Sequence, residues 1–261
     1  MSASKGSAIV TGGADGIGRA IAIRLAQDGF DVAVLDLPAS DVKAQAVVEE
    51  IREKGKRGLK LFGDVSVEED VKAAIEQVVT QWGSLDVMIA NAGISMNRPF
   101  HEMTVDDFDR LVSVNLKGVF ICYKEAAIQM MKQGRGGRII GASSIAGKKG
   151  MPGNSIYSAT KFGVRGLTQS AAMEYGKHGI TVNAYAPGVI ETNLLDKLDD
   201  YHTEQGKQPK GSWTKSLENT CVLGRNGQPE DVVPLVSFLC KEEAAFITGQ
   251  TILVDGGICF D

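Results

Sequence analysis

The side chains best suited to chemistry are Tyr157 and Lys161, four residues apart, with Ser144 thirteen residues before the tyrosine. Residues four apart share one face of a helix, so the hydroxyl and the ammonium can flank the same small volume. A free tyrosine has a pKa of about 10, and a cation about 4 Å away at an effective dielectric constant of 20 lowers it by roughly three units. The spacing therefore favours general acid–base catalysis by Tyr157, with Ser144 able to hydrogen-bond a carbonyl oxygen.

A glycine-rich turn, Thr11-Gly12-Gly13-Ala14-Asp15-Gly16-Ile17-Gly18, separates a short apolar segment from an amphipathic one. Glycines there permit a positive φ and let the backbone approach a pyrophosphate at the N-terminus of a helix. The spacing is G-x3-G-x-G rather than G-x-G-x-x-G, and a tight turn without a ligand is the alternative interpretation. The strand-turn-helix context favours dinucleotide binding.

Asp36 ends the next apolar segment, 18 residues beyond Gly18. A carboxylate at that place can accept hydrogen bonds from both ribose hydroxyls of an adenosine, and it repels a 2′-phosphate. Neither Leu37 nor Ala14 supplies the cation that a 2′-phosphate needs. NAD is therefore favoured over NADP, and the alternative is a strand-end aspartate that only caps a turn.

The elements that must position these residues alternate between short apolar and amphipathic segments. We expect helices over 16–29, 40–54 and from Tyr157 towards Lys177, and strands over 7–10, 31–36, 58–62, 85–90, 138–142, 180–186 and 251–254. Near-continuous apolar strands separated by helices are typical of a parallel sheet that is covered on both faces. The sequence predicts an α/β fold: a single domain over 1–261 built as a Rossmann-type doubly wound parallel sheet with helices on both faces.

A polar segment at about 191–221 interrupts this alternation and contains Gly206, Pro209 and Gly211. Long connections in compact domains are often lids or binding loops, so we expect a substrate-binding loop there. A surface insertion without a role is the alternative. Two basic clusters, 54–57 and 132–138, are expected on the solvated surface.

Composition excludes several classes of partner. The 261 residues include 28 Lys plus Arg and 32 Asp plus Glu, a net charge of −4, so nucleic acid and anionic membranes are poor candidates. No apolar run approaches the roughly 18 residues of a membrane span, and the first residues show no secretory signal. Four dispersed cysteines without a CxxC pair, and only three histidines, predict neither a disulfide framework nor a metal site. A cytoplasmic location is expected.

Taken together, these features resemble the short-chain dehydrogenase/reductase family. The resemblance covers the whole chain and rests on the glycine-rich turn, Asn91-Ala92-Gly93, Asn115, Ser144, Tyr157, Lys161, Pro187-Gly188-x-x-x-Thr192 and the closing Thr248-Gly249-Gln250…Asp255-Gly256-Gly257. It implies an oxidoreductase that uses a nicotinamide cofactor, needs no metal, acts on a small-molecule ketone or alcohol and assembles as a homotetramer.

The resemblance also implies catalytic roles. Tyr157 would protonate the carbonyl oxygen in reduction and act as the base in oxidation, while Lys161 would lower its pKa and hold the nicotinamide ribose. Ser144 would orient the substrate oxygen, and Asn115 would distort its helix to hold a water that links Lys161 to solvent.

The implied cofactor site is larger. Asp64 and Val65 would contact adenine, Asn91 would lie near the adenosine ribose, and Ile190 with Thr192 would hold the carboxamide. For Asn91 and Asn115 the alternative is an amide that only satisfies the local backbone. The full cofactor-binding set is Gly12, Asp15, Gly16, Ile17, Gly18, Asp36, Asp64, Val65, Asn91, Gly93, Tyr157, Lys161, Pro187, Gly188, Ile190 and Thr192.

Within the family, segments 157–169, 179–188, 206–213 and 223–232 most resemble acetoin (diacetyl) reductases, also called 2,3-butanediol dehydrogenases. The predicted substrate pocket contains Trp213 and three departures from that group: Ile145 stands for a Gln, Met151 for an Asn and Leu195 for a Trp. These changes make the pocket more apolar, unless Ile145 and Met151 are ordinary packing residues. We expect a small hydroxyketone or diketone as substrate. A sugar or polyol, a bulkier apolar ketone and, more remotely, a non-catalytic NAD-binding sensor are the alternatives.

Overall fold

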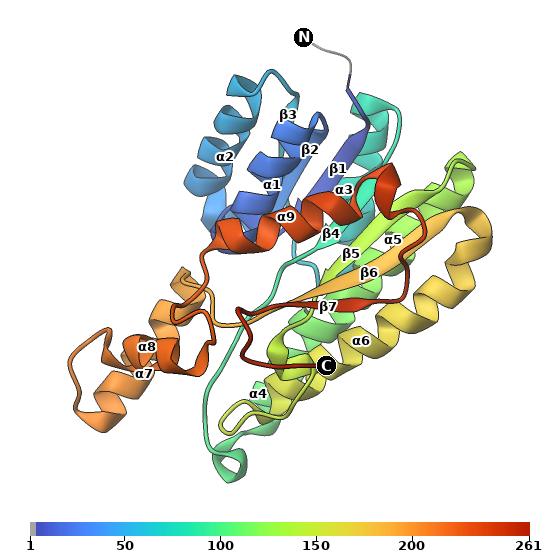
Figure 1. Ribbon diagram of the computed structural model, residues 1–261. Helices are drawn as coiled ribbons and strands as arrows, with labels where there is room; N and C mark the ends of the chain where they lie inside the picture. Colours follow the sequence, from blue (N-terminus) through green and yellow to red (C-terminus); the bar gives the residue numbers. More distant parts are fainter. Residues whose placement is uncertain (1–3) are drawn as a thin grey trace.

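The structure is a computed structural model that describes residues 4–261 (Figure 1). The expectation of no secretory signal rests partly on residues 1–3, which lie outside the described residues. A seven-stranded parallel sheet forms the centre, with the strand order β3-β2-β1-β4-β5-β6-β7. The predicted doubly wound α/β fold is therefore confirmed.

The strands are short and consist mostly of buried apolar residues, as a sheet covered on both faces requires. Their bounds are β1 Ser7–Thr11, β2 Asp31–Asp36, β3 Gly58–Phe62, β4 Val87–Ala90, β5 Gly137–Ala142, β6 Ile180–Pro187 and β7 Thr251–Val254. The predicted bounds of β2, β3 and β7 are met, and the others differ by one or two residues.

Helices cover both faces of the sheet and enclose two apolar cores. One core packs α1 Gly16–Asp28, α2 Asp41–Glu53 and α9 Pro229–Leu239 against the strands. The other packs α3 Glu68–Trp82, α5 Gly118–Gln133 and α6 Ser155–Tyr175 against the opposite face. A shorter helix, α4 Val105–Val112, precedes α5. The carboxyl ends of β1, β2, β4, β5 and β6 therefore meet along one edge of the sheet, where the candidate residues follow them.

The polar segment after β6 is mainly helical rather than an extended loop. It forms α7 Asn193–Gly206 and α8 Ser212–Leu217, which stand apart from the sheet in Figure 1. The buried carboxylate of Asp199 joins the two helices, because it accepts hydrogen bonds from the backbone N–H groups of Gly211 and Thr214. Trp213 also stacks on His202, with 4.1 Å between ring centroids. The polarity of this segment is thus compatible with a helical hairpin.

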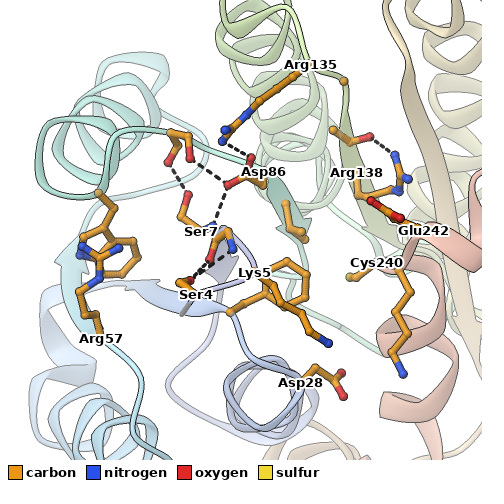
Figure 2. Close-up of a pocket in the computed structure, with 18 of the residues that line it drawn as sticks. Ser4, Lys5, Ser7, Asp28, Arg57, Asp86, Arg135, Arg138, Cys240 and Glu242 are labelled. Atoms are coloured by element: carbon orange, nitrogen blue, oxygen red, sulfur yellow. Dashed lines mark hydrogen bonds and ion pairs between the residues drawn. The ribbon is translucent and has the colours of Figure 1, made fainter. Parts of the chain in front are cut away.

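The two basic clusters lie mostly at the surface, as expected, because Lys54, Arg57, Lys132 and Arg135 are exposed. Lys56 is buried, and Arg57 binds the buried Asp31 at 2.7 Å while its guanidinium lies over the Trp82 ring. Arg57, Arg135 and Arg138 border a hollow of about 1040 Å³ at the amino edge of the sheet (Figure 2). Neither Tyr157 nor Lys161 reaches this hollow, so it is separate from the candidate chemistry.

Two features of the described chain bear on earlier expectations. Within residues 4–261, no helix combines the length and apolar character needed to cross a membrane. The same residues contain no group of three or more His, Cys, Asp or Glu side chains placed to hold a metal ion.

Candidate active site

Tyr157 and Lys161 lie on the first two turns of α6, and both side chains line one cavity of about 390 Å³. We call this hollow the Tyr157 cavity. The Lys161 ammonium lies 5.5 Å from the centre of the Tyr157 ring and donates a hydrogen bond to the Ala142 carbonyl oxygen at 2.8 Å. The helix thus brings the two groups together as their spacing predicts, but the lysine hydrogen-bonds the end of β5.

Ser144 follows β5 and caps a short helical turn, Ile145–Gly147. Its hydroxyl oxygen accepts a hydrogen bond from the Ala146 backbone N–H at 3.1 Å, and the residue is buried. The hydroxyl also acts on Tyr157, because a hydrogen bond between the two side chains favours the ionised tyrosine. Ser144 therefore lies beside the phenol, where it can share an oxygen ligand with it.

The electrostatics differ from the sequence-based expectation. Burial raises the pKa of Tyr157, and the Ser144 hydrogen bond only partly opposes this shift. Burial also lowers the pKa of Lys161 to about 8, because its ammonium has left water and pairs with no carboxylate in the described part of the chain. The expected lowering of the tyrosine pKa by Lys161 is not observed. Tyr157 holds its proton at neutral pH and is a proton donor in this state.

Asn115 lies in a single π-helical turn, Ser113–Lys117, between α4 and α5. Its buried amide donates to the Ile94 carbonyl oxygen and accepts from the Ile94 N–H, each at 2.8 Å. A Cβ built on Gly93 would lie 3.2 Å from Asn115 Oδ1 and 3.6 Å from Lys161 Nζ, so the amide and the ammonium border the same glycine. The helix distortion that the family resemblance implies is present.

The glycine-rich turn joins β1 to α1 through backbone that requires glycine. Gly12 and Gly16 have φ values of 61° and 53°, and a side chain on Gly18 would collide with the Gly12 carbonyl oxygen. Asp15 caps α1 by accepting the Gly16 N–H at 2.8 Å. The N–H groups of Ile17 and Gly18 fall in the first turn, where no preceding carbonyl can reach them, and they can bind an anion.

Asp36 lies at the carboxyl end of β2 and faces the same cavity. Its carboxylate accepts the N–H of Ala14 at 3.0 Å and that of Leu37 at 2.8 Å. Lys43, on the first turn of α2, binds Asp15 at 2.6 Å. The carboxylate thus braces the glycine-rich turn and remains available to a ligand.

The Asn91 amide makes local contacts. Its amide N–H groups bind the carbonyl oxygens of Thr11 at 2.9 Å and Gly12 at 3.2 Å, and its amide oxygen accepts the Tyr185 hydroxyl at 2.7 Å. These contacts tie the glycine-rich turn to β6. The amide thus satisfies local backbone groups, and Asn91 also lines the Tyr157 cavity.

The sequence matches a family model described as enoyl-(acyl carrier protein) reductase over residues 12–259. A short-chain dehydrogenase/reductase of Armillaria gallica is 54% identical over 97% of this chain and 96% of its own length. The 3-oxoacyl-[acyl-carrier-protein] reductase FabG of Staphylococcus aureus is 45% identical over 97% of each chain. The L-2,3-butanediol dehydrogenase of Corynebacterium glutamicum is 41% identical over 97% of this chain and 98% of its own. The chain belongs to the short-chain dehydrogenase/reductase family.

Solved structures agree with this membership. A short-chain dehydrogenase/reductase from Mycobacterium marinum matches with a TM-score of 0.90 and 32% identity over 99% of this chain and 97% of that one. The acetoin dehydrogenase YohF of Salmonella typhimurium matches with a TM-score of 0.84 and 35% identity over 97% and 95% of the two chains. This short-chain dehydrogenase/reductase is accordingly an oxidoreductase that acts on a CH–OH group with NAD(P).

The residues present fit a dinucleotide. The Tyr157 cavity collects most of the proposed cofactor residues: Gly12, Asp15, Gly16, Ile17, Gly18, Asp36, Asn91, Gly93, Tyr157, Lys161, Pro187 and Thr192. A second hollow of about 420 Å³ shares Gly12, Asp36 and Gly93 with it and adds Asp64 and Val65. A continuous trough thus runs from the catalytic pair to the end of β3. Because Gly12 and Gly18 have no side chains, a pyrophosphate can approach the backbone there.

Other proposed site residues do not line this trough. Gly188 packs against Asp255 and Ile190 packs against Gly227. Three of the four proposed substrate residues are accounted for by other surroundings: Ile145 and Leu195 are buried, and Trp213 stacks on His202. Met151 is half-buried in the segment that precedes α6.

Sequence reasoning missed several residues that face the cavity. Tyr185, Ser40, Asn193, Leu194 and Lys197 all line it. The last three belong to α7, and a helical spacing of i, i+1 and i+4 would have identified them had the segment been recognised as a helix.

Proposed function

We propose that this protein is an NAD-dependent oxidoreductase that interconverts a secondary alcohol and a ketone. The observation that carries the proposal is the placement of Tyr157 and Lys161, with Ser144 beside them, at one end of a trough shaped for a dinucleotide. A non-catalytic NAD-binding protein has no need of this proton-handling set. Similarity to a butanediol dehydrogenase and an acetoin dehydrogenase favours a small hydroxyketone or diketone as the substrate.

Each catalytic side chain has a task that follows from its surroundings. Tyr157 gives its proton to the substrate oxygen during reduction, and its raised pKa keeps that proton in place at neutral pH. Ser144 donates a hydrogen bond to the same oxygen and orients it. Lys161 holds the nicotinamide ribose, and Asn115 maintains the widened helix turn behind it. Bound NADH supplies the hydride, which is the chemistry of the cofactor.

Cofactor choice follows from the charges at the adenosine end. Asp36 places a carboxylate in the trough, which repels a 2′-phosphate and accepts ribose hydroxyls. Lys43, on the first turn of α2, is a cation near this end of the trough, but it forms an ion pair with Asp15 that offsets its charge. A 2′-phosphate would therefore meet a net negative surface, which supports NAD over NADP.

The substrate side rests on the segment at 191–221, which we take to be the substrate-binding segment of a single-domain chain. Its helices α7 and α8 follow Thr192, next to the catalytic end of the trough. Leu195 and Trp213 belong to this segment, whereas Ile145 and Met151 precede α6. A substrate pocket formed by all four would be apolar, which makes a bulkier apolar ketone the first alternative to acetoin, diacetyl or 2,3-butanediol. A sugar or polyol in another pose is the remaining alternative.

Assembly as a homotetramer is part of the proposal. Phe120 on α5 and Phe162 on α6 are 48% and 43% exposed, and Phe246 and Phe260 near the C-terminal strand are more exposed still. A contiguous apolar surface marks a site of protein association, and α5 and α6, which carry Phe120 and Phe162, pack against each other. Light scattering after gel filtration should give the mass of four chains.

The test is NADH oxidation against a panel of substrates, repeated with NADPH. The panel contains diacetyl, acetoin, a bulky apolar diketone, a ketose and a 3-oxoacyl thioester, the last because a 45% identical relative is a 3-oxoacyl reductase. We expect the highest kcat/KM with NADH and a small diketone or hydroxyketone. If another ketone is preferred, the proposed reaction stands and the proposed substrate is wrong. If NADH binds and no substrate is turned over, the enzymatic role is contradicted.

A further inference from the structure

Helix α7 directs one face of its first turns at the Tyr157 cavity. Asn193, Leu194 and Lys197 lie on that face and all line the cavity, together with the glycine-rich turn. The Asn193 amide also donates a hydrogen bond to the Asp15 carboxylate at the start of α1. The beginning of α7 is thus attached to the same helix N-terminus that a pyrophosphate would approach.

The charged side chains on the cavity wall differ in whether they have hydrogen-bond or ion-pair partners. Burial alone would raise the pKa of Asp15, but hydrogen bonds from Lys43, Asn193 and Gly16 reverse this and lower it. Lys161 is buried and donates to a carbonyl oxygen. Lys197 is exposed, and among residues 4–261 no side chain or carbonyl oxygen forms a hydrogen bond or ion pair with its ammonium. Lys197 is therefore the cation that the wall keeps available for a ligand.

A cation would strengthen the binding of a pyrophosphate at this place. It brings two negative charges to the N-terminus of α1, where the Gly16 N–H is already bound by Asp15. The positive end of the helix dipole is thus partly occupied by a carboxylate, and the Lys43 ion pair offsets the repulsion between that carboxylate and a further anion only in part. Asp36 adds a second carboxylate to the same wall. The free N–H groups of Ile17 and Gly18 meet this repulsion only in part.

We propose that Lys197 is a cofactor-binding residue whose ammonium binds the pyrophosphate of the dinucleotide and so draws α7 over the trough. The inference rests on the dinucleotide cofactor of the proposed function. It assigns to α7 a second task besides substrate binding, because the helix then responds to the bound cofactor. Asn193 attaches the start of the helix to Asp15 at the start of α1, and Leu194 lines the cavity beside it.

The experiment measures binding without turnover. Isothermal titration calorimetry with ADP-ribose, which carries the pyrophosphate, and with adenosine, which does not, compares the wild type with Lys197→Met and Lys197→Arg. Methionine keeps the unbranched stem of the side chain and removes its charge, whereas arginine keeps the charge. The matched control is Lys215→Met on α8, where the lysine is ion-paired with Glu218 and lies away from the cavity.

We expect Lys197→Met to weaken ADP-ribose binding by about two- to fivefold, the range for one partly screened charge. Lys197→Arg and Lys215→Met should bind as the wild type does, and adenosine binding should be the same in all four proteins. The difference should shrink in 1 M salt, because salt screens exposed charges.

Each outcome has a separate meaning. Equal ADP-ribose affinity in Lys197→Met and the wild type would overturn the inference and leave the proposed function intact. An equal loss for adenosine and ADP-ribose would also overturn it, because the substitution would then act through the fold of α7. If the wild type binds neither NADH nor ADP-ribose, the proposed function itself fails.

Discussion

The two ends of strand β2 carry the same residue type in opposite situations. Asp31 begins the strand, and its carboxylate accepts the Arg57 backbone N–H at 2.8 Å and the Arg57 guanidinium at 2.7 and 3.0 Å. Asp36 ends the strand and, among the donors of residues 4–261, its carboxylate accepts only the backbone N–H groups of Ala14 and Leu37. A carboxylate with a guanidinium partner is neutralised, whereas one held by backbone N–H groups keeps its charge for a ligand.

The same contrast extends along both edges of the sheet. At the amino edge, Asp86 binds Arg135 and also accepts the Ser7 N–H, as Figure 2 shows. At the carboxyl edge, the buried Lys161 ammonium donates to a single carbonyl oxygen. Matched groups stabilise a fold, and groups with unused charge reduce its stability and bind ligands. Substitutions should therefore change stability at the amino edge and chemistry at the carboxyl edge.

The largest effect should come from Tyr157→Phe. Removing the proton donor should lower kcat by about a thousandfold, within the usual range for general acid catalysis. NADH binding, measured by fluorescence titration, should change little, because the phenyl ring still fills its place. Tyr175→Phe, at the other end of α6, is the matched control and should retain full activity. Residual turnover above a tenth of the wild-type rate would assign proton transfer to another group.

The burial of Lys161 should be visible in the pH dependence of stability. Its pKa is lowered by burial from 10.5 to about 8, which corresponds to about 3 kcal/mol. Below pH 8, Lys161 is protonated in both the folded and the unfolded protein, and burying its charge destabilises the fold. Between pH 8 and 10.5 the unfolded protein binds more protons than the folded protein, so the free energy of unfolding rises with pH.

Lys161→Met removes this titration. Between pH 7 and 10.5, the free energy of unfolding of the wild type should rise by up to about 3 kcal/mol relative to that of the variant, as measured by urea denaturation. Lys177→Met, an exposed lysine, provides the comparison and should show no such trend. A constant difference across this range would mean that Lys161 titrates alike in both states.

The fold was predictable from the sequence because its signals are local. Apolar segments of four to eight residues between helices specify a parallel sheet, and the chain places Gly12, Asp36, Ser144 and Tyr157 at one edge of it. The prediction of a long loop at 191–221 was incomplete, because the contacts that build its helical hairpin lie among Asp199, Gly211 and Thr214 and need tertiary structure.

Electrostatics were the harder part of the site to predict. The four-residue spacing of Tyr157 and Lys161 indicates proximity but not burial, and burial raises the pKa of the tyrosine instead of lowering it. Similarly, a sequence cannot show that Lys43 is ion-paired with Asp15 while Lys197 pairs with no acidic side chain of residues 4–261. Both features depend on side chains that meet only after the sheet has formed.

At the amino edge, Asp31→Asn should destabilise the fold by about 2 kcal/mol and lower Tm by roughly 4 to 8 °C. The side chain is buried and the guanidinium of Arg57 would lose its charged acceptor. Burial alone would raise the pKa of Asp31, but the hydrogen bonds from Arg57 lower it below 3.8. The greater stability of the wild type over Asp31→Asn should thus be lost as the pH falls below 3.8 and the Asp31 carboxylate becomes protonated. Unchanged Tm, or a changed kcat/KM, would contradict the contrast between the two edges.

At the carboxyl edge, Asp36→Asn should alter cofactor choice with a smaller change in stability. Without the negative charge a 2′-phosphate is no longer repelled, so the ratio of kcat/KM for NADH to that for NADPH should fall about tenfold. Asp41→Asn, on the exposed start of α2, should leave the ratio unchanged. Asparagine offers one acceptor oxygen where two backbone N–H groups now bind, so some loosening of the glycine-rich turn is expected. Loosening alone would weaken both cofactors equally, and only repulsion by the Asp36 charge can change their ratio.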